Sequence, residues 1–358
     1  MSISTDSTVA STMRAVRVHA VEGHGRLQLD LDVPVPRAGP GSVLLAVKAC
    51  GLNQVDLLTR DGQTPAPVPL PHISGTEVAG DIVDVGPDVR GWKCGDQVVV
   101  DPILFCGECA SCRIGDTNMC RNSRVFGVQT PGGYAQYVVA PARQVLALPR
   151  GLTHLQAASM AVTGPTAWHM LHSRARLRMG EDVLVIAAGS GIGVLGVQIA
   201  KLAGARVIAT AGSTQKVAQA QALGADLVVN HSEPDWADQV RAFTGGRGVD
   251  VVFEHVGAAT WQASLKAMAR GGRLVTCGGH SGFQVDINLW HLFVKQHSLI
   301  GSFAATRQDF IDVMRLAEQG RLQPVIQQVL PLHRIAEGQA LMQARKVFGK
   351  LMIDPTLN

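Results

Sequence analysis

The chain has 358 residues, of which 46% are hydrophobic and 17% charged, so it can bury a sizeable core and has the length of two domains. Its formal net charge of +4 is small and its lysines and arginines are scattered, which argues against a nucleic-acid partner. No stretch approaches the ~20 apolar residues of a membrane helix and residues 1–12 lack a signal-peptide core, so we expect a cytoplasmic protein with a small-molecule substrate and no membrane partner.

Short segments rich in β-branched and other apolar residues dominate the first 140 residues. Turns rich in Gly and Pro, such as PVPRAGPG, separate them, which favours strands. The predicted strands are Arg14–Val18, Val43–Ala49, Ala79–Val85, Gln97–Asp101 and Tyr134–Ala140. This part of the chain is therefore predicted to be a barrel-like β domain.

Four cysteines gather between the fourth and fifth of these segments. Cys106, Cys109, Cys112 and Cys120 have the spacing C-x2-C-x2-C-x7-C in a loop that contains Gly, Asp and Asn. The spacing allows four thiolates to surround one zinc ion at about 2.3 Å, and a metal site is favoured over disulfides in a cytosolic protein. Four sulfur ligands leave no coordination position for water or substrate, so we predict a structural zinc.

The pattern changes in the second half of the chain. Residues 153–172 have a helical pattern, and the segments VLVIAA, RVIATA, LVVN, VVFEHV and RLVTC then alternate with helical segments. This alternation predicts a parallel, doubly wound sheet. A later amphipathic helix and a final strand, Lys350–Ile353, are expected to return to the first domain. The expected domains are therefore 13–157 and 158–299, with 300–358 returning to the first.

One segment combines a buried apolar strand, a glycine turn and a helix. Its turn is formed by Gly189, Ser190, Gly191, Ile192 and Gly193. The glycines permit a tight turn and the close approach of a pyrophosphate, which lies over the N–H groups at the positive end of the helix. Because strand and helix both flank the glycines, we predict a dinucleotide-binding site.

The end of the next strand, ARVIATA, bears on the choice of cofactor. An NAD-selecting enzyme normally has an acidic residue there, whereas this chain has Ala211, followed by Gly212 and Ser213, with Lys216 beyond. A small polar turn and a lysine suit a 2′-phosphate, since the ammonium supplies charge and the serine hydroxyl donates a hydrogen bond. We therefore predict NADP(H), with an ordinary solvated lysine as the alternative reading of Lys216.

These motifs together resemble the medium-chain dehydrogenase/reductase superfamily from Met13 to Ile353. The matching stretches are the four-cysteine lobe, GTEVAGDIVDVGPDV, GGYAQYVVAP, the glycine turn and FGKLMID. The superfamily includes zinc alcohol dehydrogenases, zinc-free quinone oxidoreductases and enoyl reductases. The resemblance implies an α/β fold, with a GroES-like β-barrel catalytic domain and a doubly wound parallel-sheet (Rossmann) cofactor domain.

The sequence departs from the zinc alcohol dehydrogenases where they hold their catalytic zinc. Those enzymes usually have ligands in Cys-Gly-x-Cys-x-x-Asp, in Gly-His-Glu and before the first glycine of the cofactor domain. The corresponding segments here are CGLNQVD with Asn53, GTE with Thr76, and AVTG with Val162 and Thr163. An amide and a hydroxyl are poor donors to zinc, so no catalytic zinc is expected. The segment NQVDLLTRDG resembles the quinone oxidoreductase pattern instead.

Without zinc to polarise an alcohol oxygen, conjugate reduction is the easier reaction. Hydride then goes to the β-carbon of an activated double bond, and charge develops on a carbonyl oxygen that needs hydrogen-bond donors. Asn53 is the candidate donor, and the resemblance places Thr163 at the nicotinamide or substrate. Asp56 is a candidate for proton transfer. For Asp56 and Glu77 we favour the alternative that they orient loops through hydrogen bonds from the backbone or Arg60.

The cofactor site is expected to include residues that follow later strands, because strand ends line the cofactor crevice of a doubly wound sheet. We assign to it Val256, Cys277, Gly278 and Lys350, the last from the closing FGKLMID. His280 has a weaker claim. His72, His169 and His172 are expected to be structural.

The expected function is NADPH-dependent reduction of quinones or activated C=C bonds, and two alternatives stay open. One is a zinc-type alcohol or aldehyde dehydrogenase with unusual ligands. The other is a non-catalytic cofactor-binding protein, for which a role on RNA is disfavoured by the low net charge. A homodimer or homotetramer is expected, and a subunit contact is favoured over a pocket wall for Trp290, Phe293 and Phe303.

Overall fold

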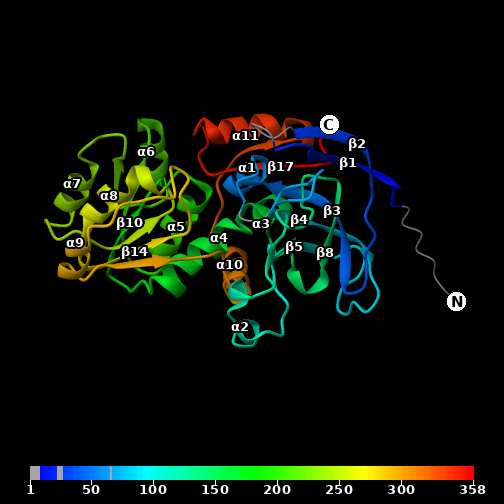
Figure 1. Ribbon diagram of the computed structural model, residues 1–358, viewed down its shortest axis with the longest axis horizontal. Coiled ribbons are helices and arrows are strands. Elements are labelled where there is room, and N and C mark those ends of the chain that lie inside the picture. The colour runs from blue at the N-terminus through cyan, green and yellow to red at the C-terminus, as the bar shows by residue number, and fades with distance from the viewer. Residues whose placement is uncertain (1–8, 22–26, 65–66) are drawn as a thin grey trace. The chain divides into compact units, whose positions relative to one another are not determined.

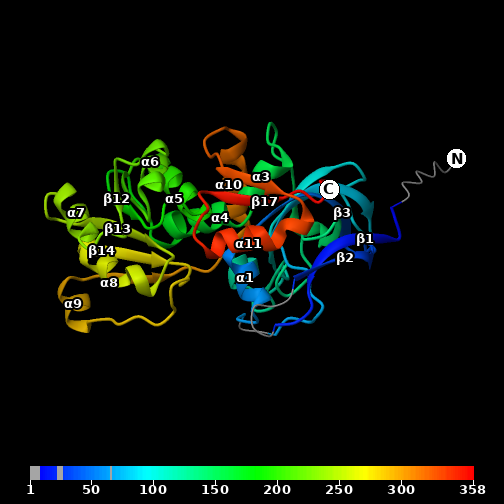
Figure 2. The same cartoon turned by 90° about the horizontal axis from the view of Figure 1, so that it is seen from above.

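The computed structural model describes residues 9–21, 27–64 and 67–358, which fold into two compact units. The first unit contains the chain up to Val162 together with Gln328–Lys346 and Leu351–Asn358. The second contains Thr163–Gln327 and Val347–Lys350. Figures 1 and 2 show the elements of each unit in two views. None of the helices in the described part of the chain is long and apolar enough to cross a membrane.

The first unit is mostly β. Its strands are β1 (Thr12–Val18), β2 (Leu27–Pro34), β3 (Ser42–Gly51), β4 (Glu77–Val85), β5 (Gln97–Val100), β6 (Ile103–Leu104), β7 (Arg124–Val125), β8 (Tyr137–Pro141) and β9 (Val145–Ala147). Its helices are α1 (Gln54–Arg60), α2 (Ala110–Arg113), α3 (His154–Met160) and α11 (Ile335–Gln343). The strands β16 (Ile326–Leu330) and β17 (Lys350–Ile353) continue into it from the second unit.

Strand β3 is the centre of the main sheet, which has the order β16-β17-β3-β4-β5-β9 with β8 also paired to β3. Its sequence, SVLLAVKACG, is almost wholly apolar, and most of its side chains are buried. Strand β3 ends at Gly51, and α1 begins three residues later. The residues between strand and helix, including Asn53, are therefore held at one end of the sheet.

The second unit is built on a six-stranded parallel sheet with the order β12-β11-β10-β13-β14-β15. Its strands are β10 (Asp182–Val185), β11 (Arg206–Ala211), β12 (Leu227–Asn230), β13 (Val249–Glu254), β14 (Met268–Thr276) and β15 (Ser298–Gly301). Its helices are α4 (Thr163–Trp168), α5 (Gly191–Leu202), α6 (Thr214–Ala222), α7 (Trp236–Phe243), α8 (Ala258–Ala267), α9 (Leu289–Val294) and α10 (Arg307–Glu318). A π-helical turn, His169–Arg174, extends α4.

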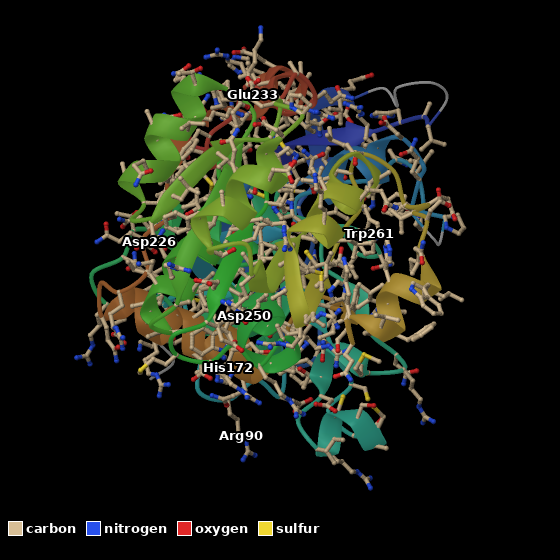
Figure 3. All side chains as sticks on the ribbon, turned by 90° about the vertical axis from the view of Figure 1, so that its left-hand side faces the viewer. Arg90, His172, Asp226, Glu233, Asp250 and Trp261 are labelled. Carbon is tan, nitrogen blue, oxygen red and sulfur yellow. The ribbon has the colours of Figure 1, made fainter. Side chains whose placement is uncertain are left out.

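The sheet of the second unit has an apolar core. Leu184, Ile208 and Val252 from three neighbouring strands pack with Trp261 of α8. Figure 3 labels Trp261 of α8, together with Asp250 near the start of β13 and Glu233, which follows β12. Because all six strands are parallel, their carboxyl ends meet at one edge, where cofactors bind in doubly wound sheets.

The predicted fold class is confirmed, but the expected domain limits were wrong. The second unit starts at Thr163 instead of 158 and continues to Gln327 instead of ending at 299. The reason is that α10 belongs to it, since Asp309 of α10 is hydrogen-bonded to His169. Strands β2 and β16 and helix α11 were not predicted, and Tyr134 precedes its predicted strand, which starts at Tyr137.

Candidate functional site

The glycine turn of the second unit connects β10 to α5. Ser190 caps the helix: its Oγ accepts a hydrogen bond from Gly193 N at 3.0 Å and donates to Ala187 O at 2.9 Å. A Cβ atom on Gly193 would lie 2.5 Å from Ala187 O, so only glycine allows the helix to start this close to the strand. The first N–H groups of a twelve-residue helix therefore face the carboxyl edge of the sheet, as anion binding requires.

The segment that leads into β17 lies against this turn. Gly349 N donates to Gly189 O at 2.8 Å, and the side chain of Lys350 is buried. A Cβ atom on Gly191 would lie 2.5 Å from Lys350 Cδ and 3.3 Å from Thr163 Cγ2. The structure thus brings Lys350 and Thr163 to the glycine turn. The sequence analysis assigned Lys350 to the cofactor site, and the resemblance placed Thr163 at the nicotinamide or the substrate.

The cofactor-selecting residues follow β11. Ser213 caps α6 by accepting a hydrogen bond from Lys216 N at 3.4 Å. Lys216 Nζ donates to Val347 O at 2.7 Å, and burial lowers the pKa of this lysine. Lys216 is therefore half-buried beside the glycine turn, where a Cβ atom on Gly189 would lie 3.5 Å from its Cδ. It is not the ordinary solvated lysine that the sequence left as the alternative.

His231 is a residue of this site that the sequence did not reveal. It follows β12, which pairs with β11 so that Asn230 lies opposite Ala211. Its Nδ1 is 2.8 Å from Thr210 Oγ1, and a Cβ on Gly212 would lie 3.0 Å from its Nε2. Only the strand order could have revealed His231, because β11 and β12 are parallel neighbours and the loops at their carboxyl ends therefore lie side by side.

The loops after β13 and β14 are tied to each other at the same edge. Ser281 donates from both its N and its Oγ to Val256 O, at 2.8 and 2.7 Å. Buried Glu254 shapes the first loop by accepting hydrogen bonds from Val256 N and Gly257 N, and burial raises the pKa of this carboxyl. Cys277 and Gly278 follow β14, and burial raises the pKa of the Cys277 thiol to about 12. A thiol with that pKa stays neutral at pH 7.

Two histidines, His255 and His280, lie in these loops. His255 is fully buried and its Nε2 lies 2.9 Å from Ile186 O, at the end of β10. Burial, with the nearby His280, lowers the pKa of His255 to about 3, so its ring is neutral at pH 7. Its ring is 6.5 Å from that of His280. His255 therefore fastens the loop after β13 to the strand that leads into the glycine turn.

The second group of candidate residues lies in the first unit. Asn53 Nδ2 donates to Thr76 Oγ1 at 3.1 Å. Asp56 Oδ2 accepts hydrogen bonds from Asn53 N at 2.7 Å and from Tyr134 OH at 2.7 Å. The side chains of Asp56, Thr76 and Tyr134 are buried. Three distant segments, at residues 53–56, 76 and 134, thus meet at Asn53.

The two carboxylates of this region orient backbone. Asp56 holds the Asn53 N–H, and Glu77 Oε1 accepts a hydrogen bond from Val162 N at 2.9 Å. Of the two donors expected from the sequence, backbone or Arg60, the backbone supplies these hydrogen bonds, and Arg60 donates to Asp61 and Gln339. Asp56 and Glu77 therefore make the contacts of loop-orienting residues.

The four cysteines of the first unit converge as a metal site requires. The ligand sulfurs of Cys106, Cys109, Cys112 and Cys120 all lie within 4.8 Å of one another. Backbone N–H groups already point at them: Cys109 N donates to Cys106 Sγ and Cys106 N to Cys120 Sγ, each at 3.4 Å. Hydrogen bonds led by that from the Cys112 backbone lower the pKa of Cys109 to about 6. These residues fit a zinc ion held by four thiolates.

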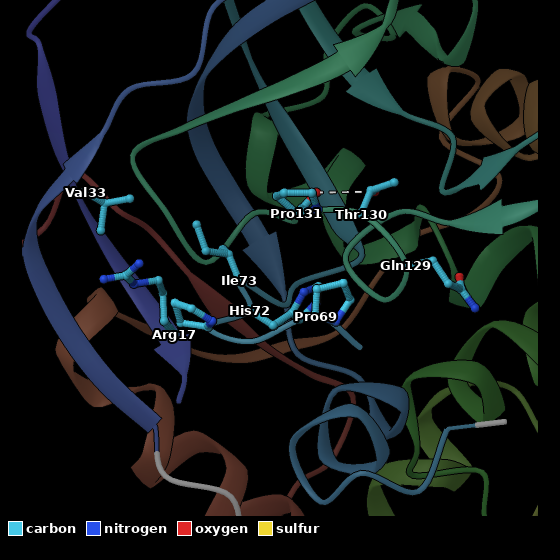
Figure 4. Close-up of a pocket in the computed structure, with 9 residues that line it drawn as sticks. Arg17, Val33, Pro69, His72, Ile73, Gln129, Thr130 and Pro131 are labelled. Atoms are coloured by element: carbon cyan, nitrogen blue, oxygen red, sulfur yellow. Dashed lines mark hydrogen bonds between the residues drawn. The ribbon is translucent and has the colours of Figure 1, made fainter. Parts of the chain in front are cut away.

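A small cavity of about 190 Å³ also lies in the first unit (Figure 4). Its polar wall residues already have protein partners. Arg17 is paired with Asp30, His72 Nε2 is 3.1 Å from Gly127 O, and Gln129 Oε1 accepts a hydrogen bond from a backbone N–H. We assign no ligand to this cavity.

Comparison with known proteins agrees with this geometry. Residues 39–150 match the alcohol dehydrogenase GroES-like domain, and residues 191–319 match the zinc-binding dehydrogenase family. An NAD-dependent alcohol dehydrogenase of Sulfolobus acidocaldarius is 33% identical, over 96% of this chain and 100% of the relative. A quinone oxidoreductase of Rattus norvegicus is 31% identical, over 97% of this chain and 99% of the relative.

A solved structure described as an NAD-dependent alcohol dehydrogenase is 43% identical, with a TM-score of 0.92, and the match covers 96% of this chain and 99% of that chain. The predicted GroES-like domain and Rossmann domain are confirmed by these matches.

Proposed function

Because this chain belongs to the medium-chain dehydrogenase/reductase superfamily and is an oxidoreductase of that superfamily, we propose that it reduces quinones or activated C=C bonds with NADPH. The observation that carries the proposal is the hydrogen bond between Asn53 and Thr76. This chain resembles the zinc alcohol dehydrogenases, and by that resemblance an amide and a hydroxyl stand at two positions where those enzymes have ligands of the catalytic zinc. Neither group is a good ligand for zinc.

The proposed reaction is a conjugate reduction in which this chain supplies binding and hydrogen bonds. When bound, NADPH supplies the hydride that goes to the β-carbon. Nδ2 of Asn53 carries two hydrogens; Thr76 Oγ1 accepts one, and the carbonyl oxygen of the substrate accepts the other as charge develops on it. A proton from water or a weak acid then completes the reduction at the α-carbon.

The residues of the second unit would hold the cofactor. The N–H groups at the start of α5 suit the pyrophosphate, and the buried ammonium of Lys350 adds positive charge beside them. Ala211 leaves the end of β11 without a carboxylate, while Lys216 and His231 flank the Gly212 turn. In binding NADPH, Lys216 would exchange the Val347 carbonyl for the 2′-phosphate.

A zinc-type alcohol or aldehyde dehydrogenase is the second candidate function. It is favoured by the Sulfolobus relative, which is described as an NAD-dependent alcohol dehydrogenase. Metal content separates the two: one zinc per chain fits the reductase and two fit the alcohol dehydrogenase. A cofactor-binding protein without catalysis would bind NADPH and turn over none of the acceptors.

The test is a screen of NADPH oxidation with quinones, enones, enoyl thioesters and saturated aldehydes. We expect turnover with a quinone or a conjugated carbonyl, and we expect a mild chelator of labile zinc to leave it intact. Asn53→Ala should reduce turnover ~10-fold to 100-fold, because a lost oxyanion donor costs up to a few kcal/mol, while the Kd for NADPH stays nearly unchanged.

Two results would refute the scheme. Activity that is lost with the chelator and restored by added zinc would favour the alcohol dehydrogenase. Unchanged turnover of Asn53→Ala on every accepted substrate would remove the amide from the mechanism.

A further inference from the structure

One carboxylate oxygen of Asp56 links the hydroxyl of Tyr134 to Asn53. Oδ2 of Asp56 accepts the hydrogen bond of Tyr134 OH and that of Asn53 N, each at 2.7 Å. The Asn53 side chain continues the chain of hydrogen bonds to Thr76 Oγ1 at 3.1 Å. The main chain and side chain of Asn53 are thus fixed from two directions, by Asp56 and by Thr76.

The ring of Tyr134 also packs against the segment that carries Thr76. A Cβ atom on Gly75, whose φ is +105°, would lie 2.8 Å from Tyr134 Cδ1 and 2.7 Å from Cys50 Sγ. Tyr134 N donates to Ser74 O at 3.0 Å. One residue therefore contacts the backbone before Thr76 through its ring and the Asp56 carboxylate through its hydroxyl.

The hydroxyl of Tyr134 is a fixed donor. The residue is fully buried, and burial raises the pKa of its phenol well above the usual value, so it keeps its proton throughout the working pH range. A buried phenol needs an acceptor, and a carboxylate is a strong one. Removing the hydroxyl would leave Asp56 Oδ2 with one fewer donor while the ring still fills its space.

From this geometry we infer that Tyr134 is a positioning residue for the proposed reaction, acting through Asp56 to aim the Asn53 amide at the substrate oxygen. The inference rests on the proposed function for the role of Asn53, but the placement of the amide by Tyr134 can be measured without turnover. Tyr134 itself touches no substrate or cofactor in this scheme.

The kinetic test is a double-mutant cycle with Tyr134→Phe and Asn53→Ala. The acceptor is 1,4-naphthoquinone or trans-3-penten-2-one, whichever the wild-type protein reduces faster. We expect Tyr134→Phe to lower kcat about fivefold, the loss typical of one hydrogen bond, with the Kd for NADPH unchanged. Added to Asn53→Ala, it should have no further effect, because its only route to the reaction is through Asn53.

Tyr137→Phe on β8 is the matched control, because it removes the same hydroxyl from a half-buried tyrosine of the same unit. It should leave kcat unchanged. A fivefold loss that persists in the Asn53→Ala background would overturn the inference, since it would mean that Tyr134 acts by another route. Asp56→Asn, which changes the shared acceptor, is a second variant and should show the same dependence on Asn53.

A second readout does not depend on activity. In protein labelled with ¹⁵N-asparagine, the side-chain amide signal of Asn53 is identified by its loss in Asn53→Ala. Tyr134→Phe should shift this signal and Tyr137→Phe should not. An unmoved signal would overturn the inference even if turnover fell. If instead no acceptor is reduced, or Asn53→Ala keeps full turnover, the proposed function fails and the signal alone decides whether Tyr134 positions the amide.

Discussion

His169 Nδ1 lies 2.7 Å from Oδ2 of Asp309, although 140 residues separate them in the chain. Both side chains are buried. Ser173 Oγ donates to the other carboxylate oxygen at 3.0 Å, and Thr306 donates to Oδ2 from its N and Oγ1. One carboxylate thus caps α10 and fastens it to the π-helical turn after α4.

This carboxylate should make stability depend on pH. Burial alone would raise the pKa of Asp309, but hydrogen bonds from His169 and Thr306 outweigh it and hold the pKa below its usual value of 3.8. A lowered folded-state pKa stabilises the protein fully above the unfolded-state pKa, and this contribution is lost as the pH falls through the folded-state pKa.

Asp309→Asn should therefore cost about 1.5–3 kcal/mol at pH 7, as expected for lost hydrogen bonds to a charged group, and flatten the acid end of the stability profile. Urea unfolding between pH 7 and the acid limit of folding measures both effects. Asp312→Asn, on the same helix but in a surface pair with Arg315, is the control. An Asp309→Asn protein with the wild-type pH profile would show that this carboxylate is not responsible.

NADPH should bind at least tenfold more tightly than NADH, equivalent to about 1.4 kcal/mol. The reason is that Ala211 offers no carboxylate to the ribose hydroxyls while Lys216 lies beside the turn. Lys216→Ala should reduce this preference, whereas Lys201→Ala, which breaks only a surface pair with Asp226, should not. Fluorescence titrations give the dissociation constants, and equal values for the two cofactors in the wild-type protein would contradict the proposal.

Cys112→Ser should leave the protein zinc-poor and less stable, because an incomplete set of thiolates loses most of the metal's contribution to folding. Cys94→Ser is the control, since Cys94 is exposed and outside the four-cysteine cluster. Zinc content by elemental analysis and the melting temperature are the measurements. Wild-type zinc content in Cys112→Ser would exclude this cysteine as a ligand.

We propose that the chain forms a homodimer or homotetramer through the apolar surface around α9. That surface is formed by exposed Phe283, Ile287, Leu289, Trp290, Phe293, Val294 and Phe303. It adjoins β15, the last strand of the sheet, whose sequence SLIG has no charge or proline to protect an open edge. A second copy would cover both the apolar side chains and the edge.

The double variant Trp290→Glu, Phe293→Glu should shift the mass measured by light scattering toward that of the monomer. Met179→Glu is the control, because Met179 is 85% exposed but lies far from α9 in sequence. A wild-type protein that is already monomeric, or a double variant with unchanged mass, would rule out this interface.

The sequence was sufficient where the signal is local. The glycine turn from Gly189 to Gly193 and the cysteines from Cys106 to Cys120 lie within short segments, so spacing alone predicts their geometry. Strands β1, β3, β4, β5 and β8 of the first unit were predicted from turn residues and β-branched runs. Such features need no knowledge of the rest of the chain.

Long-range contacts explain what the sequence did not reveal. The placement of α10 depends on the pair His169 and Asp309, and no periodicity connects two residues so far apart. His231 became visible only when β12 was known to pair with β11. In the sequence, Tyr134 is one aromatic residue after two glycines. Its role depends on the hydrogen bond from its hydroxyl to Asp56, which lies 78 residues earlier in the chain.

The division of β17 between the two units bears on how the chain is made by the ribosome. Lys350 belongs to the second unit and Leu351 to the first, whose sheet places β17 directly beside β3. Strand β3 ends at Gly51, but its neighbour begins only at Lys350, so the two are made at very different times in translation. The first unit therefore cannot close its sheet until β17 has been made, whereas the six parallel strands of the second unit have all been made once the chain reaches Gly301.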